Sequence, residues 1–221
     1  MGLKSFGFLC RAAVFTATLT GASASYGATV ELVSNGGFES GNVGFSTDFT
    51  NANGATPGLE SVSVMTSDYF GLSAHSGTAF LAVNGGNVSG ALPTVWAQEV
   101  AVVSGVQYAI SFELGGTATQ PTPVGQLSVQ LDGAEILNAL APASATYLSF
   151  GTTFIASATG TFTLSFVEQS TGYGGNDYGL DEISLTYDDQ QMSAVPVPAG
   201  GLLLLSALGL GGLLGRRRVL T

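Results

Sequence analysis

The central part of this 221-residue chain contains no lysine and no arginine. All five basic residues lie near the two ends, whereas all 15 acidic residues lie between Glu31 and Asp189. Ion pairs between Lys or Arg and a carboxylate are therefore excluded from the central part. Nucleic acid is excluded as a partner, because neutralising its phosphates needs clustered cations.

Cysteine and histidine are nearly missing as well. Cys10 is the only cysteine and His75 is the only histidine. If Cys10 is removed with a leader peptide, the mature protein has no disulfide, no reactive thiolate and no Cys-ligated zinc. The sequence offers His75 no nucleophile-elbow motif as a partner, so we interpret it as a surface or loop residue and expect no catalytic triad.

Residues 1–24 are predicted to be a secretory signal peptide. Lys4 and Arg11 are followed by the small, apolar run AAVFTATLTGASA. Ala22 and Ala24 occupy the small-x-small positions of a cleavage site. A buried N-terminal helix is the alternative interpretation.

Residues 29–188 are predicted to form one all-β domain, followed by a polar linker at 189–194. Apolar and polar residues alternate along segments 106–114, 126–133, 161–169 and 181–189. A period of two indicates strands with one buried face, and turn residues such as Asp132-Gly133 separate the segments. Counting the further candidates at 60–66, 78–85, 95–103 and 147–156, we expect about eight to ten strands in an antiparallel β-sandwich with jelly-roll topology.

Two segments at opposite ends of this domain gather oxygen-bearing side chains. If the first and last strands lie side by side, segments 34–45 and 174–185 bring together Asn35, Glu39, Asn176, Asp177, Asp181 and Glu182. With no basic residue nearby in the sequence, such carboxylates repel one another unless a cation such as Ca²⁺ joins them. The alternative is that these residues serve only the turns.

Sugar-related chemistry offers further candidates. Glu99 and Glu113 would provide paired carboxylates for glycoside hydrolysis if their strands pair, although both occupy the polar faces of their strands. Aromatic residues that could stack on a sugar ring are Trp96, Tyr69, Phe70 and Tyr173. Trp96 is equally suited to the core, because it shares a strand face with Val100 and Val102.

Bracketing motifs give a resemblance over nearly the whole domain. NGGFESG (35–41) and DEISL (181–185) resemble those of galactose-binding-like β-sandwiches of the carbohydrate-binding-module type. The segments HSGTAFLAVNG and WAQEVAVVSGVQYAISFEL resemble the middle strands of the same families. The resemblance implies a structural Ca²⁺ between the first and last strands, with Glu39 and Asp181 as ligands and Asn35, Asn176 and Asp177 as weaker candidates.

The C-terminal segment 195–218 has the layout of a sorting signal. Its uncharged stretch at 199–215 is about 26 Å long as a helix, near the lower limit for a transmembrane span. The basic residues that follow would stay on the cytoplasmic side, which places the domain outside. The segment resembles the PEP-CTERM signal in its V-P-x-P-A form, which implies processing by an exosortase-type transpeptidase; the matching residues are Val195, Pro196, Pro198, Ala199, Arg216, Arg217 and Arg218.

We therefore predict a non-enzymatic β-sandwich protein that passes through the inner membrane to the cell surface or the extracellular matrix. Its partners would be the membrane, the transpeptidase and an extracellular polysaccharide, with Ca²⁺ as the only cofactor. The alternatives are a secreted carbohydrate-active enzyme with paired carboxylates and a permanently anchored surface protein.

Overall fold

The computed structural model describes residues 27–86, 91–118, 124–170 and 176–193. The predicted signal peptide 1–24 and sorting segment 195–218 lie outside the described residues. Within the described ranges, no helix is long and apolar enough to cross a membrane.

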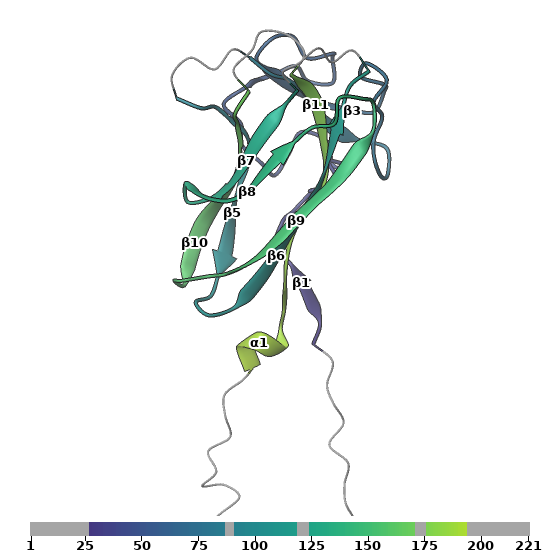
Figure 1. Cartoon of the computed structure of the whole chain (residues 1–221). Coiled ribbons are helices and arrows are strands. Elements are labelled where there is room, and N and C mark those ends of the chain that lie inside the picture. Colours follow the sequence, from purple (N-terminus) through teal and green to yellow (C-terminus); the bar gives the residue numbers. More distant parts are fainter. Residues whose placement is uncertain (1–26, 87–90, 119–123, 171–175, 194–221) are drawn as a thin grey trace, which may run out of the picture.

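The described residues form two β-sheets that pack face to face (Figure 1). The seven-stranded sheet runs in the order β2 (Thr50–Asn51), β3 (Ser61–Met65), β4 (Phe80–Asn84), β11 (Asp177–Asp188), β6 (Gln107–Gly116) and β9 (Tyr147–Ile155), and β1 (Thr29–Glu31) also pairs with β11. The four-stranded sheet has the order β5 (Thr94–Val102), β10 (Gly160–Glu168), β7 (Gln126–Leu131) and β8 (Ala134–Leu140). Only the short β2–β3 pair is parallel. The predicted all-β sandwich is thus confirmed, and a short helix α1 (Gln190–Ser193) follows β11.

Alternating side chains from both sheets fill the space between them. The ring of Phe112 from β6 meets that of Phe166 from β10 edge-on, with centroids 4.8 Å apart. Trp96 from β5 contacts Phe166 in the same geometry at 5.5 Å. Such edge-to-face pairs favour packing beyond the area that they bury. Trp96 is fully buried, so its interpretation as a core residue is confirmed.

The hairpin predicted at Asp132-Gly133 joins β7 to β8. Both residues have positive φ, 47° and 79°, as the two central positions of a type I′ turn require. Leu131 and Ala134 pair across the turn. The Asp132 carboxylate also accepts a hydrogen bond from the backbone N–H of Thr163 at 2.7 Å, so the turn is tied to β10.

The first and last strands of the domain lie side by side, as expected. Thr29, the first residue of β1, pairs with Asp188, the last residue of β11. Past β1, the N–H of Ile183 donates to the carbonyl of Gly36. A Cβ atom at Gly36 would lie 1.8 Å from the carbonyl oxygen of Ile183, so glycine permits this close approach. Between Asp181 and Ser184 the register of β11 against β6 shifts, which is the mark of a β-bulge.

The connection from β3 to β4 (residues 66–79) covers part of the outer face of the seven-stranded sheet. Leu72 from this loop packs over Gly115 and Gly179, where an added Cβ would come within 2.8 Å and 2.6 Å of its methyl carbons. A small apolar cluster forms beneath the loop from Met65, Tyr69, Leu72, Phe80 and Ala82. This anchoring fixes the path of the loop segment 73–79 that follows.

One carboxyl group is buried at the end of β10. Glu168 has no exposed surface and accepts hydrogen bonds from the hydroxyl of Tyr178 at 2.5 Å and the N–H of Ser170 at 2.8 Å. Burial raises the pKa of Glu168, and the hydrogen bonds oppose that shift.

The raised pKa of Glu168 predicts a specific pH dependence. Above pH 4.5, the ordinary pKa of the side chain, the unfolded chain releases this proton while the folded protein still holds it. The Glu168 contribution to the free energy of unfolding therefore falls as pH rises through that window. Glu168→Gln is expected to flatten the decline in urea midpoint from pH 4.5 upward. Glu135→Gln, at an exposed glutamate, should keep the wild-type slope; equal slopes in the two variants would contradict the assignment.

Candidate functional site

Two of the predicted metal-binding residues hold the same loop. The Glu39 carboxylate accepts the backbone N–H groups of Thr78 and Ala79 at 2.7 Å and 2.8 Å, and also the hydroxyl of Thr78. The Asp181 carboxylate accepts the N–H groups of His75 and Ser76 at 2.8 Å and 3.2 Å. The N-terminal turn, the 73–79 loop and the bulge of β11 therefore meet at these two side chains.

The two carboxylates differ in their surroundings. Glu39 is exposed, and the N–H donors of Ala79 and Thr78 lower its pKa. Asp181 is fully buried, and this burial raises its pKa. Hydrogen bonds from backbone N–H groups act in the opposite direction and lower it. Each carboxylate has about four lone-pair sites, and three of them are used in each case.

The weaker metal candidates lie in three different settings. Asn35 stabilises the N-terminal turn: its amide group donates to the carbonyls of Gly41 and Val43. Asn176 is buried and donates to the carbonyl of Gly86. Asp177 accepts from the hydroxyl of Tyr69 at 3.3 Å, about 13 Å along β11 from Asp181 at the usual rise per residue.

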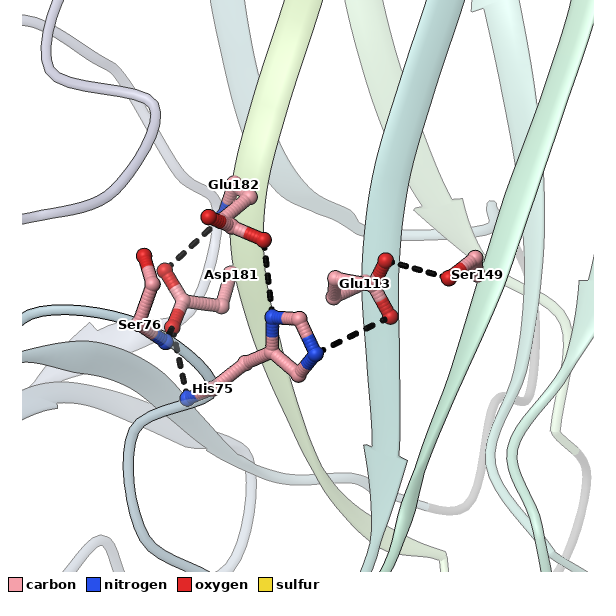
Figure 2. Close-up of polar contacts among 6 residues, drawn as sticks. All are labelled: His75, Ser76, Glu113, Ser149, Asp181 and Glu182. Carbon is pink, nitrogen blue, oxygen red and sulfur yellow. Dashed lines mark hydrogen bonds and ion pairs between the residues drawn. The ribbon is translucent and has the colours of Figure 1, made fainter.

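A group of titratable side chains surrounds His75 on the outer face of the seven-stranded sheet. Figure 2 shows its imidazole between the carboxylates of Glu182 and Glu113. The Nδ1 atom lies 2.7 Å from an oxygen of Glu182, and the Nε2 atom lies 3.9 Å from an oxygen of Glu113. One ring nitrogen and one oxygen of each glutamate lie within 4.8 Å of one another. Ser149 on β9 donates to the other oxygen of Glu113.

Tyr147 completes this group from the neighbouring strand β9. Its ring centroid lies 5.2 Å from that of His75. Its hydroxyl oxygen is buried and has no hydrogen-bond partner among the described residues. Burial raises the pKa of Tyr147 far above its usual range, and the charges of Asp181 and Glu113 add to the shift.

The sequence interpretation missed the grouping of His75, Glu113 and Glu182. It placed His75 correctly in a loop but gave it no partner. Glu182 has a φ of 51° at the bulge, which turns its side chain out of strict alternation and toward the loop. Charge alone was the available signal: one histidine stands in a domain whose other ionisable groups are almost all acids.

The pairing of Glu99 with Glu113 does not occur. Glu99 lies on β5 of the four-stranded sheet, and Glu113 lies on β6 of the seven-stranded sheet. Both side chains alternate with core residues, so they point to opposite sides of the sandwich. Strands β5 and β6 follow each other in the chain but belong to different sheets. Sequence periodicity does not reveal this difference.

Two of the four predicted stacking residues are unavailable to a ligand. Trp96 and Tyr69 are buried, whereas Phe70 is 44% exposed at the surface of the 66–79 loop. Tyr173 lies outside the described residues.

The outer face of the four-stranded sheet carries a polar surface with two open grooves. Thr163 on β10 lies between Glu99 on β5 and the turn residue Asp132. Thr163 lines both grooves; one also includes Leu92, Thr94, Gln130, Asp132, Gly133, Ser165 and Val167, and the other Gly44, Phe45, Ser46, Ala97, Gln98 and Glu99. These linings provide hydroxyl, amide and carboxylate groups, which together both donate and accept hydrogen bonds.

Comparison with known proteins supports the fold. No protein-family model matches the chain, and no curated protein matches it. The Stig cyclase Fisc from Fischerella sp. TAU, solved in complex with (3Z)-3-(1-methyl-2-pyrrolidinylidene)-3H-indole, aligns over 73% of this chain and 98% of its own, at 14% identity and a TM-score of 0.54. Another cyclase structure from Fischerella sp. TAU covers 72% of this chain and 97% of its own, at 15% identity and a TM-score of 0.53.

A carbohydrate-binding module in complex with β-1,4-galactotriose covers 72% of this chain and 99% of its own, at 19% identity. Its TM-score is 0.48. The two cyclase alignments, at their low identities, show a shared β-sandwich fold and nothing of the chemistry.

Proposed function

We propose that this chain is an exported, non-catalytic protein whose β-sandwich, of the galactose-binding-like jelly-roll type, contacts a polysaccharide outside the cell. The observation that carries the proposal is the polar outer face of the four-stranded sheet, with its two grooves meeting at Thr163. Sugar hydroxyl groups both donate and accept hydrogen bonds, so a surface that mixes amide, hydroxyl and carboxylate groups suits them. Grooves open to solvent suit an extended chain better than a small enclosed ligand.

A matched pair of threonine variants tests this face. Thr163→Ala removes a hydroxyl from the shared wall of both grooves, whereas Thr153→Ala makes the same change at an exposed position on β9 of the other sheet. One lost neutral hydrogen bond should weaken glycan binding about twofold to tenfold in the first variant and leave the second unchanged. The measurement is a glycan array with the full chain in mild detergent, followed by titration of the best ligand.

Equal affinity of the two variants would move the binding site away from this face, and an array without any bound polysaccharide would end the proposal. New reducing ends in the same samples would instead favour the enzyme alternative. That alternative now rests on Glu113 and Glu182, whose carboxylates, unlike those of Glu99 and Glu113, come together in the structure.

The same proposal includes a structural Ca²⁺ held by Glu39 and Asp181. The donor set fits this ion, because it consists of carboxylate oxygens beside glycine-containing turns. Gly37 lies next to the Asp181 carboxylate and Gly77 next to that of Glu39. Each carboxylate also keeps a lone-pair site beyond its three hydrogen bonds. A bound divalent cation would offset the repulsion between the two acids in a domain without lysine or arginine.

Calcium removal gives the corresponding prediction. With Ca²⁺ about 100-fold above its Kd, the melting temperature of the wild type should exceed that in chelator by about 5–10 °C. Glu39→Gln should lose most of this shift, while Glu135→Gln should retain it. A wild-type protein that melts at the same temperature with Ca²⁺ and with chelator rules out the ion.

The sorting part of the proposal is that an exosortase-type transpeptidase cuts the chain near Pro196 and Pro198. The sequence layout supports it: a proline-containing motif, an apolar stretch and three arginines in that order. Prolines keep the backbone extended, in the form that protease-like active sites bind. Before this cleavage, the domain would be held on the outer side of the inner membrane. Cleavage would release it to the surface or matrix.

Mass spectrometry of the exported protein tests the sorting step. The mature mass is expected to lack residues 1–24 and everything after the proline-containing motif. Ala substitution of both Pro196 and Pro198 should leave the C-terminal segment attached and the protein in the membrane fraction. Retention of Arg216, Arg217 and Arg218 in the wild-type surface protein would establish permanent anchoring instead.

A further inference from the structure

The side chains around His75 are arranged in an order typical of metal centres. Metal-binding histidines almost always donate their second ring N–H to a carboxylate or carbonyl, which fixes the tautomer and the ring orientation. Here Nδ1 lies 2.7 Å from an oxygen of Glu182, and because an ionised carboxylate only accepts hydrogen bonds, we assign a proton to Nδ1 of the neutral imidazole. The lone pair of Nε2 then faces the carboxylate of Glu113 at 3.9 Å.

The separation between these two atoms is close to what a shared ion requires. Zinc binds histidine nitrogen and carboxylate oxygen at about 2.1 Å, so tetrahedral ligands lie about 3.4 Å apart. A movement of about 0.5 Å by Glu113 would reach that spacing. Glu113 is a long side chain that also accepts a hydrogen bond from Ser149, and it is 13% exposed.

The local negative charge and an unpaired hydroxyl group also favour an ion beside His75. Glu113 and Glu182 flank one imidazole and Asp181 accepts the backbone N–H of the same histidine, in a domain that contains no lysine or arginine to balance these acids. The ring of Tyr147 lies beside that of His75, and its buried hydroxyl has no hydrogen-bond partner among the described residues. A water molecule bound to an ion at Nε2 would give that hydroxyl an acceptor.

We propose that His75 Nε2 and the Glu113 carboxylate bind a divalent transition-metal ion of the Zn²⁺ type, with Glu182 orienting the imidazole and Tyr147 donating to a metal-bound water. Imidazole favours Zn²⁺, Cu²⁺ and Ni²⁺ over Ca²⁺, which takes oxygen ligands. The site therefore uses different ligands from the proposed Ca²⁺ site. With two protein ligands, it keeps open positions for water or for an oxygen atom of a bound partner.

The experiment is a Zn²⁺ titration of the untagged full chain by isothermal calorimetry, in buffer with excess Ca²⁺. All proteins carry Cys10→Ser, so that no thiol contributes. One equivalent of Zn²⁺ should bind, His75→Gln and Glu113→Gln should each weaken binding more than tenfold, and Glu182→Gln should weaken it about tenfold through loss of orientation. The matched control Glu135→Gln, at an exposed glutamate away from the 73–79 loop, should bind as the wild type does.

Because His75 is the only imidazole, ¹⁵N-histidine NMR reports on it alone. Before addition of Zn²⁺ the spectrum should show the Nδ1–H tautomer, and Zn²⁺ should shift the Nε2 signal in slow or intermediate exchange. Thermal melts of each variant establish that it is folded. A wild-type chain that binds no Zn²⁺, or a His75→Gln variant that binds it equally well, would falsify the proposal.

Discussion

Backbone N–H groups take the place of cations throughout this domain. With no lysine or arginine between the two ends of the chain, the carboxylates that hold loops accept hydrogen bonds from other donors. Asp181 accepts three backbone N–H groups, Glu39 accepts two, and Asp132 accepts one from a neighbouring strand. Hydrogen bonds to a charged acceptor are stronger than neutral ones, so these contacts fix the loops against the sheets.

Hydrogen bonding to backbone N–H groups leaves the net charge of the domain unchanged. An N–H group stabilises a carboxylate through its dipole and does not cancel its charge. The fold therefore concentrates negative potential where acids from different segments meet, beside the 73–79 loop. Both proposed cation sites lie there, whereas the proposed polysaccharide face lies on the other sheet. Ion binding and ligand binding can thus occur on opposite sides of one small core.

The period-two pattern was enough to predict most of the fold. Strands β6, β7, β10 and β11 were all expected from alternation, and the Asp132-Gly133 turn was expected from its residue types. The pairing of strands was harder. Nothing local distinguishes β5 and β6, which follow each other in the chain, as members of different sheets, because that choice depends on the packing of the whole sandwich.

The candidate site was predictable only in part, for a related reason. Glu39 and Asp181 were found through motifs that bracket the domain, and the meeting of these segments follows from the β1–β11 pairing. The association of Glu182 with His75 depends on one irregular residue in the bulge and on a loop fastened by Leu72. Both are exceptions to periodicity, so a method based on periodicity overlooks them.

The antiparallel pairing of β1 with β11 has a mechanical consequence. Thr29 and Asp188 are neighbours, so the described domain begins and ends at the same end of the sandwich (Figure 1). A force that separates the two ends of the chain would load the β1–β11 hydrogen bonds one after another, as in unzipping, rather than all together in shear. A pull on the C-terminal end alone, against resistance at the sheet faces, would load the β11–β6 and β11–β4 ladders along their length. The domain is therefore built to resist tension between one end of its chain and its faces better than tension between its two ends.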